Sequence, residues 1–419
     1  MSEIERRDPS ANRSITIVLC FCVAVLEGFD LQIIGVMAPA IREAIHLTPQ
    51  QMGWIFSASL IGLALGAAYG GWLADRVGRK PVLIGSVVVL GVFTLAAALA
   101  SDPNSLLAMR FLAGLGIGGA MPNLIAVVSE VAAKGKVTST VSLMFCGMPL
   151  GGVLVALLAR LASGVIGWQG LFVIGGVLPL IVAALLAYNL KETGVRRKSS
   201  ERQAAPRYVD SLFGQGQALR TVLLWLVFAL TLLQLSLLLN WLPSLVINRG
   251  FAPRDAFITT MVVNIGSIIG AFTIGRACDR FGVRWPMFLV YLLMAVSLSA
   301  LAIASGRATL WAAALAAGYF VLGSQFVLYG LAPRLYEHQA RGAGVGAAVA
   351  VGRVGAITGP LLVGLALGAG ASSGRVILLL VPLVIAAGAA LFWLTYIAQD
   401  SLSREQSRGT PAELVKVTT

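Results

Sequence analysis

The chain repeats one ten-residue pattern. The first copy, GWLADRVGRK, occupies residues 71–80, and the second, GRACDRFGVR, occupies residues 275–284. Glycine, aspartate, arginine and glycine recur in the same register, because each residue of the second set follows its counterpart by 204 positions. Each copy lies between two long apolar runs. A polar turn repeated at this separation indicates two halves of similar structure.

The residue types within this pattern suggest a gate. Gly71 would allow close helix packing, Gly78 a tight turn, and Asp75 an ion pair with basic residues across an interface between the halves. A positive anchor with a turn is the simpler interpretation, but the in-register repeat favours a conformational latch. The expected latch residues are Asp75, Arg76, Gly78, Arg79, Asp279 and Arg280, with Lys80 beside them.

The composition indicates that lipid surrounds the chain. Of its 419 residues, 58% are hydrophobic and only 12% are charged, and the mean hydropathy is +0.87. A soluble domain carries about 25% charged residues, twice this share. The net charge of +13 does not indicate nucleic-acid binding, because the Arg and Lys residues fall mostly in short gaps between apolar runs.

Apolar runs of about 20 residues, long enough to span a bilayer as a helix, occur twelve times. The expected spans are residues 14–37, 52–74, 82–100, 105–129, 138–162, 168–190, 221–245, 256–276, 286–304, 309–331, 342–368 and 375–398. The fold class is therefore an all-α membrane protein with two bundles of six helices.

The basic residues predict how these spans are oriented. If residue 1 is cytoplasmic, the cytoplasmic gaps and tails hold 23 of the 31 Lys and Arg residues, and the outer gaps hold six. Positive charge concentrates on the cytoplasmic side of membrane proteins, so we expect both termini inside. The expected units are a tail (1–13), a six-helix bundle (14–190), a cytoplasmic linker (191–220), a second bundle (221–398) and a tail (399–419).

Four charged residues lie well inside the expected spans: Glu27, Asp30, Arg110 and Arg353. Each costs about 2.5–3.5 kcal/mol to insert, which makes them functional candidates. At 1.5 Å per residue, Glu27 and Arg353 lie near the midplane, whereas Asp30 and Arg110 lie at similar depths nearer the outer surface.

These depths suggest roles in transport. We expect Asp30 and Arg110 to form a structural or switching pair and Glu27 to carry a proton, with Asp30 as the second proton-coupling candidate. A static ion pair is the alternative for both acids. The planar guanidinium of Arg353 would suit a substrate carboxylate; hydrogen bonding between helices is its alternative.

Uncharged groups in the spans could bind an aromatic ring. The candidates are Asn240, Trp241, Gln325 and Tyr329, and each could instead serve ordinary helix packing. Neither a nucleophile–base pair nor a metal-ligand constellation can be assembled from the sequence. We therefore expect a protein that is not an enzyme and that uses no cofactor and no metal.

The pattern at 71–80 resembles the signature loop of the major facilitator superfamily. The string RFLAGLGIG (110–118) in the fourth span resembles a second signature. Its glycines also match a dinucleotide-binding pattern, but that pattern needs a preceding strand, so helix packing is favoured. The resemblance implies two six-helix bundles that alternate in access. Val283 replaces a basic residue of the signature, which implies a weaker second latch.

The string LEGFDLQ (26–32) resembles the acidic first-span signature of the aromatic acid:proton symporter family. Six further strings are similar to its 3-(3-hydroxyphenyl)propionate branch: QMGWIFS (51–57), PNLIA (122–126), NWLP (240–243), VLY (327–329), LAP (331–333) and VAVGR (349–353). Many hydroxybenzoate carriers have Asp where this chain has Glu27. That difference favours the phenylpropionate branch and leaves the substrate open.

The resemblance implies a monomeric symporter that imports an aromatic carboxylate with protons across a bacterial inner membrane. The acid would be 3-(3-hydroxyphenyl)propionate or a related hydroxylated compound. Other substrates (hydroxybenzoate, muconate, a dicarboxylate) and drug export remain open; CGMPLGG (146–152) is faintly similar to an antiporter signature. A sensor that binds without translocating is a further alternative, for which the residues after Gln399 form a short tail.

Overall fold

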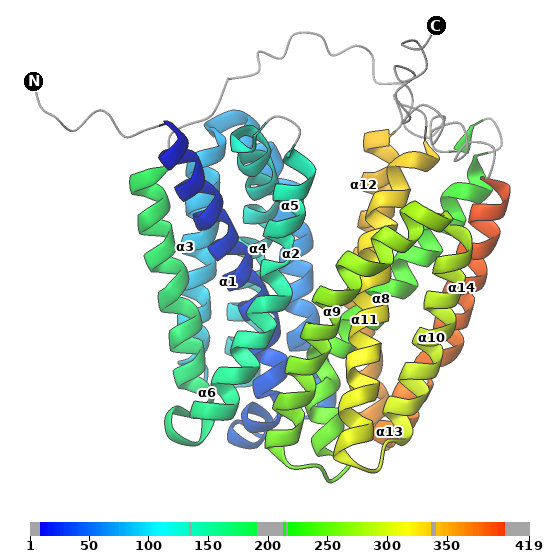
Figure 1. Cartoon of the computed structure of the whole chain (residues 1–419). Helices are drawn as coiled ribbons and strands as arrows, with labels where there is room; N and C mark the ends of the chain where they lie inside the picture. Colours follow the sequence, from blue (N-terminus) through cyan, green and yellow to red (C-terminus); the bar gives the residue numbers. More distant parts are fainter. Residues whose placement is uncertain (1–8, 134–135, 191–212, 215–216, 337–340, 399–419) are drawn as a thin grey trace, which may run out of the picture.

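The computed structural model describes residues 9–133, 136–190, 213–214, 217–336 and 341–398, and every regular element in this part is helical (Figure 1). The first half contains α1 (Pro9–Ala44), α2 (Pro49–Val77), α3 (Arg79–Ala97), α4 (Pro103–Val131), α5 (Val137–Phe145) and α6 (Gly147–Asn189). The second half contains α8 (Ala218–Ile247), α9 (Pro253–Phe281), α10 (Arg284–Ile303), α11 (Arg307–Leu331), η1 (Ala332–Leu335), α12 (Arg341–Gly368), α13 (Ser373–Leu378) and α14 (Leu380–Ile397).

Twelve helical segments among the described residues are long and apolar enough to cross a membrane, as the sequence predicts. The first runs past its expected end at residue 37 to Ala44. The fifth span consists of α5 and the first part of α6, and the sixth is the rest of α6. Gly167, with φ +65° and ψ −173°, interrupts the helical backbone between these two spans. Only a glycine adopts such angles readily, so the chain reverses there within a few residues.

The helices form two bundles, α1–α6 and α8–α14, that stand side by side (Figure 1). In the first bundle α1 packs on α6, α2 on α4, and α3 on both α4 and α6. In the second, α8 packs on α12, α9 on α11, and α10 on α14. When the spans are numbered from 1 to 12 in chain order, span 1 packs on span 5, span 2 on span 4, and span 3 on span 6. The equivalent pairs in the second bundle are spans 7 and 11, 8 and 10, and 9 and 12. The repeat in the sequence is thus a repeat in helix packing.

Glycines bring α2 and α4 into backbone contact. A Cβ atom on Gly62 would lie 2.1 Å from the carbonyl oxygen of Phe111, and one on Gly66 would lie 2.2 Å from that of Leu115. From the other side, a Cβ on Gly118 would lie 2.1 Å from the carbonyl oxygen of Leu63. Even a methyl group therefore does not fit in this seam, which makes the two helices one packed unit.

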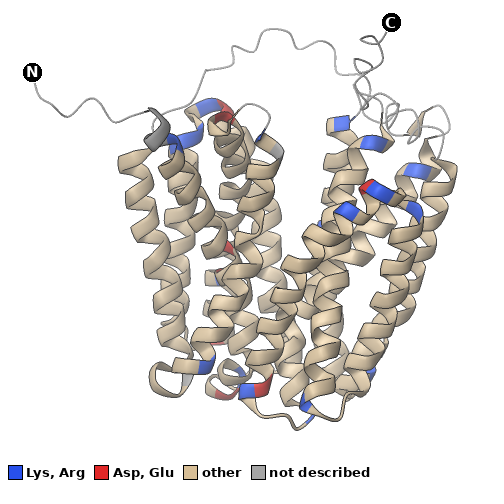
Figure 2. Cartoon of the chain, in the orientation of Figure 1, with Lys and Arg blue, Asp and Glu red and all other residues tan. Residues whose placement is uncertain are grey.

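Charge gathers at the two ends of the bundles, and most Lys and Arg residues lie at the end where α1 begins and α14 stops (Figure 2). We call this end the terminal side and the opposite end the distal side. The expected linker at 191–220 and both tails fall mostly outside the described residues. The described helices reach into the first tail, where α1 starts at Pro9, and into the linker, where α8 starts at Ala218.

On the distal side, Asp102 caps the start of α4. Its carboxylate accepts hydrogen bonds from the backbone N–H groups of Ser105 at 3.0 Å and Asn104 at 2.9 Å. These bonds, with that from Ser105 foremost, lower the pKa of the Asp102 carboxyl below its ordinary value. The cap fixes the beginning of the helix that carries Arg110.

Candidate functional site

Arg110 of α4 and Asp30 of α1 form a bidentate ion pair in which both side chains are 0% exposed. Nη2 of Arg110 lies 2.8 Å from Oδ2 of Asp30, and Nη1 lies 2.9 Å from Oδ1. Nη2 also donates to the Asp30 carbonyl, and Nε donates to the Ser59 hydroxyl at 3.2 Å. The Thr94 hydroxyl donates to Oδ1 of Asp30. The pair expected from the sequence is present and joins α1, α2, α3 and α4.

This pair neutralises both charges in the observed conformation. Removing one partner of a buried ion pair typically costs about 3–5 kcal/mol, because the other charge is left uncompensated. The contacts therefore give Asp30 and Arg110 a structural role here. A proton-coupling role for Asp30 remains a prediction, since it would require this network to open.

Glu27 lies on the same face of α1, about 4.5 Å nearer the terminal side at 1.5 Å per residue. It is 1% exposed, and its Oε1 atom has no hydrogen-bond partner among the described residues. Most buried polar atoms in proteins are hydrogen-bonded, so such an exception calls for an explanation. Glu27 is thus the buried acid of α1 that has hydrogen-bonding capacity left.

Arg353 projects from the face of α12 that turns toward the first bundle. Further along that face, Pro360 and Gly364 touch α2: a Cβ on Gly53 would lie 2.9 Å from the Pro360 carbonyl oxygen, and one on Gly364 would lie 2.7 Å from that of Pro49. Positions 353, 360 and 364 share one stripe of the helix. Arg353 is half-buried and has no ion-pair or hydrogen-bond partner among the described residues. Its guanidinium is available for a ligand.

Tyr329 and Gln325 lie one turn apart on α11. The Tyr329 ring meets Phe228 edge-on at 5.5 Å and is 36% exposed. Phe228 of α8 also packs against α12, because its Cβ would lie 3.3 Å from a Cβ on Gly352, the residue before Arg353. Gln325 is 4% exposed, and neither atom of its amide has a partner in the described part of the chain. Phe228 thus links the helix of Tyr329 to the helix that carries Arg353.

Asn240 and Trp241 lie in the contact between the bundles. Trp241 is fully buried, donates from Nε1 to the Pro360 carbonyl at 3.0 Å, and meets the Phe56 ring edge-on at 5.2 Å. The backbone oxygen of Asn240 would lie 2.7 Å from a Cβ on Gly35 of α1. Phe56 and Gly35 belong to the first bundle. Both predicted ligand residues therefore serve closure in this conformation.

A pair of amides also crosses between the bundles. Nδ2 of Asn264 in α9 donates to Oε1 of Gln32 in α1 at 2.8 Å, and Nε2 of Gln32 donates back to Oδ1 at 3.1 Å. Gln32 is 3% and Asn264 0% exposed. Gly152 of α6 makes room for them, because a Cβ there would lie 2.2 Å from Nε2 of Gln32. We call this reciprocal pair the amide bridge.

The turns of the two repeated loops form as the sequence predicts. Gly78 joins α2 to α3 with φ +100°, and Gly282 follows the end of α9 with φ +78°. L-residues with side chains rarely adopt these values. The packing role expected for Gly71 is wrong, because a Cβ there would meet open space. Its neighbour Gly70 makes that contact, with its Cβ position 2.6 Å from the Cα of Gly119.

The basic residues of the first loop are bound within their own bundle. Arg79 forms an ion pair with Glu130 at the end of α4. Lys80 donates to the carbonyl oxygen of Ala187 near the end of α6 at 3.0 Å. The start of α3 is therefore anchored to α4 and α6.

The latch acids are free in this conformation. Asp75 and Asp279 are exposed, and neither has an ion-pair or hydrogen-bond partner among the described residues. Arg76 lies over the ring of Trp72 at 3.9 Å, and Arg280 lies over the ring of the next residue at 5.3 Å. The pairing between bundles expected of these acids thus stays a prediction for another conformation.

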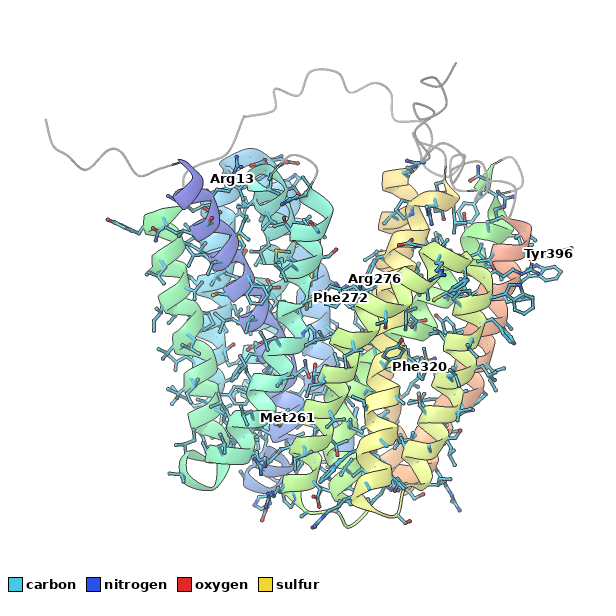
Figure 3. All side chains as sticks on the ribbon, viewed as in Figure 1. Arg13, Met261, Phe272, Arg276, Phe320 and Tyr396 are labelled. Carbon is cyan, nitrogen blue, oxygen red and sulfur yellow. The ribbon has the colours of Figure 1, made fainter. Side chains whose placement is uncertain are left out.

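A cavity of about 520 Å³ separates the bundles on the terminal side. It is lined by α5 of the first bundle and by α9 and α11 of the second, with Ser142, Arg276, Asp279, Phe326 and Arg334 among its residues. Arg276 donates a hydrogen bond to the carbonyl of Phe272, and both residues lie where α9 faces the first bundle (Figure 3). Toward the distal side α1 touches α8, α2 touches α12, and α6 touches α9. The protein is open on the terminal side and closed on the distal side.

A sequence model described as the Major Facilitator Superfamily matches residues 20–274 and 257–418. The chain belongs to this superfamily. As its twelve spans and its transporter relatives show, it is a multi-pass protein of the inner membrane.

Three proteins similar in sequence to this chain are named as transporters of aromatic acids. The 3-(3-hydroxy-phenyl)propionate transporter of Escherichia coli K12 is 44% identical over 92% of this chain and 96% of its own length. A 4-hydroxybenzoate transporter of Pseudomonas aeruginosa is 34% identical over 90% and 91%. A gallate transporter of Pseudomonas putida is 31% identical over 88% of each chain.

Solved structures of the superfamily share the fold at low identity. The nucleoside transporter NupG superposes with a TM-score of 0.78 at 13% identity, covering 91% of this chain and 99% of that one. The D-xylose-proton symporter gives a TM-score of 0.71 at 17% identity, covering 90% and 96%. These likenesses establish the arrangement of twelve helices.

Sequence reasoning missed the amide bridge. Gln32 ends the first-span string LEGFDLQ, but nothing in that string shows that its side chain meets another bundle. The available signal was an uncharged amide within a span, which is costly unless it is hydrogen-bonded. Its partner could not be identified, because the partner lies 232 residues away.

Proposed function

We propose that this superfamily member is a proton-coupled symporter that imports an aromatic carboxylate, 3-(3-hydroxyphenyl)propionate or a related hydroxylated acid. The relative with 44% identity is a 3-(3-hydroxy-phenyl)propionate transporter, and the other relatives named above carry hydroxybenzoate and gallate. All three substrates are aromatic acids with a ring hydroxyl.

The state of Glu27 carries the proposal of proton coupling. Its carboxyl is buried near the midplane with one oxygen unpartnered, while the neighbouring acid, Asp30, is neutralised by Arg110. An unpaired charge in such a place is costly, whereas a protonated carboxyl carries no charge. Glu27 would therefore take up or release a proton only when a change of conformation brings water to it.

In this proposal the terminal side faces the cytoplasm, as the distribution of basic residues indicates. The observed conformation is then open inward. In the outward-open conformation the amide bridge and the contact of α2 with α12 would separate. The terminal side would close at the same time, and Asp75 and Asp279 would find partners across the interface.

The proposed substrate site lies between the midplane residues of both bundles. Arg353, which has no acidic partner in the described part of the chain, would bind the carboxylate through its guanidinium. Tyr329 would contact the ring, since it is exposed and already packs edge-on against Phe228. The free amide of Gln325 would hydrogen-bond the ring hydroxyl. Asn240 and Trp241 would join the site only when the distal contact opens.

Uptake by proteoliposomes tests the proposal. Labelled 3-(3-hydroxyphenyl)propionate should accumulate when an inward proton gradient is imposed, and a protonophore should abolish the accumulation. Protein-free liposomes provide the control. Equal uptake with and without the gradient would contradict proton coupling. If the inserted protein takes up 4-hydroxybenzoate or muconate but not 3-(3-hydroxyphenyl)propionate, the proposed substrate is wrong and the proposed reaction stands.

A further inference from the structure

A second cavity, also of about 520 Å³, lies on the distal side. It forms where α1, α8 and α12 end and where α2 begins. The first bundle contributes Arg42 and Pro49, and the second contributes Asn248, Arg249 and Leu367. The volume is within the range of about 300–1,000 Å³ typical of small-molecule sites. Because both bundles line it, the shape of this cavity must change whenever the bundles move.

The charge of this cavity is positive and uncompensated. Arg42 is half-buried, and its one hydrogen bond runs from Nε to the carbonyl of Leu47 at 3.4 Å. Arg249 donates from Nη1 to the carbonyl of Leu301 at 2.5 Å and from Nη2 to that of Ala304. Neither arginine belongs to an ion pair in the described part of the chain, and no acidic residue lines the cavity. Two arginines that belong to no ion pair among the described residues thus line the cavity, together with no acid.

The cavity continues the face of α12 that carries Arg353. Positions 353, 360, 364, 367 and 371 follow one another at intervals of three, four or seven residues, so they form a single stripe. Arg353 stands at one end of this stripe, Pro360 and Gly364 make the distal contact with α2, and Leu367 and Ala371 line the cavity. Arg353 and Leu367 are about 21 Å apart along the helix axis. The stripe therefore connects the cavity with the proposed substrate site through the closed contact.

We propose that the distal cavity is an entry site in which Arg42 and Arg249 bind the carboxylate of the incoming aromatic acid before the distal contact opens. This proposal rests on the proposed function, since it takes the distal side as the outer side. The ligand is a small organic monoanion with an aromatic ring. Two cationic groups within low-dielectric walls raise the local concentration of anions and hence the rate of productive encounter. Opening of the distal contact would then pass the acid along α12 toward Arg353.

A chemical protection experiment tests the site without relying on transport. The native cysteines (Cys20, Cys22, Cys146 and Cys278) are replaced by alanine, and Asn248→Cys places one exposed thiol at the cavity. A membrane-impermeant maleimide is added to cells from outside. We expect 3-(3-hydroxyphenyl)propionate to slow labelling several-fold, and the uncharged alcohol 3-(3-hydroxyphenyl)propanol to have no effect.

Further variants separate this site from the central one. Protection should disappear in Arg42→Gln, persist in Arg42→Lys, and persist in Arg353→Ala, in which the central site is impaired. Arg160→Gln removes an exposed arginine of α6 that does not line the cavity, and it should leave protection unchanged. Protection that survives Arg42→Gln, or that is lost in Arg353→Ala, would overturn the proposal, because the effect would then come from the central site.

Uptake kinetics provide the second readout. Arg42→Gln should raise the KM for uptake roughly 3- to 10-fold at low ionic strength and leave the maximal rate unchanged. The difference should shrink in 0.5 M salt, since about 0.5 M salt screens charges over a few ångströms. An unaltered KM at low ionic strength would contradict an entry site. If the parent protein takes up no acid at all, the proposed function fails, whereas the protection experiment still decides whether the cavity binds the anion.

Discussion

Glu27 and Asp30 differ by one helical turn and have opposite surroundings. Asp30 accepts hydrogen bonds from Arg110 and from the Thr94 hydroxyl, whereas Oε1 of Glu27 has no partner among the described residues. Asp30 is held in a bidentate pair whose disruption would leave a buried charge uncompensated, whereas Glu27 has no such partner among the described residues. This contrast supports the proposal that Glu27 carries the proton and that Asp30 has a structural role in the observed conformation.

Glu27→Gln should abolish proton-driven accumulation. Glutamine keeps the shape and hydrogen-bonding capacity of the protonated side chain but cannot release a proton. Exchange of labelled for unlabelled acid across the membrane should persist, because it needs no net proton movement. Proteoliposome uptake and exchange check the two expectations, and an unchanged melting temperature in detergent shows that the variant is folded. Full accumulation would remove Glu27 from the mechanism.

Arg353→Ala should weaken the binding of aromatic carboxylates roughly 10- to 100-fold, because a hydrogen bond to a charged group contributes about 1.5–3 kcal/mol. The matching aromatic alcohol should bind as it does to the parent protein. Arg353→Lys keeps the charge without the planar fork and should fall between the two. Equilibrium binding to purified protein measures all three. An equal loss for acid and alcohol would show that Arg353 serves packing.

The positions of individual residues could be predicted from the sequence where they depend only on the geometry of one helix. Counting residues from the ends of the spans matched the depths of Asp30 and Arg110, because the rise per residue is fixed. The same reasoning could not show that Trp241 is enclosed between Phe56 and Pro360, since that depends on how two bundles meet. It also assigned close packing to Gly71, which meets open space, because one residue from Gly70 shifts the direction by about 100° around a helix.

Among the elements, the two repeated loops differ in how firmly they are anchored. The first is tied to α4 and α6 through Arg79 and Lys80. Val283 occupies the equivalent of the Arg79 position in the second loop and offers no charge for such a bond. The first loop is thus better placed to present its acid, Asp75, at a fixed position.

Asp75→Asn should slow transport about 2- to 5-fold, because an exposed ion pair in the other conformation contributes about 0.5–1 kcal/mol. Substrate affinity should change little. Asp279→Asn serves as the comparison and should have the smaller effect, as its loop is less anchored. Initial uptake rates and equilibrium binding measure the two quantities. An unchanged transport rate in Asp75→Asn would show that the first loop serves as an anchor and not as a latch.

Helix number and approximate bounds followed from the sequence, because the bilayer demands about 20 apolar residues per span. The places where the helical backbone is broken did not follow from the sequence. The fifth span passes from α5 to α6 at Cys146, and the non-helical backbone of Gly167 separates the fifth span from the sixth. The hydropathy of the sequence does not reveal either feature, since neither changes the polarity of the chain.

At the scale of the molecule, two similarly packed bundles meet through the contacts of α1 with α8, α2 with α12 and α6 with α9. Within the first bundle, seams such as the one at Gly62 and Gly66 join helices by their backbones. Tightly packed units move as bodies more readily than they bend. Sequence alone could not tell which side is open, because such states differ by only a few kcal/mol.

A cross-link on the distal side should therefore stop transport. Gln50 at the start of α2 reaches Gly368 at the end of α12, where an added Cβ would lie 2.2 Å from Cδ of Gln50. In a cysteine-free background, the pair Gln50→Cys and Gly368→Cys should form a disulfide on oxidation and reduce uptake at least about 10-fold. A reductant should restore uptake. Each single variant is the control, and normal uptake by the oxidised pair would contradict opening at this contact.

The amide bridge between Gln32 and Asn264 bears on how the contact between the bundles responds to pH and to salt. Amide groups neither titrate in the physiological range nor attract counterions. A contact made of amides should keep the same strength at acidic or alkaline pH and at low or high salt, whereas one made of carboxylates and guanidinium groups would weaken with either change. In the proposed orientation this bridge would therefore hold whatever the external pH and salt concentration, and we expect external pH to act on transport through Glu27.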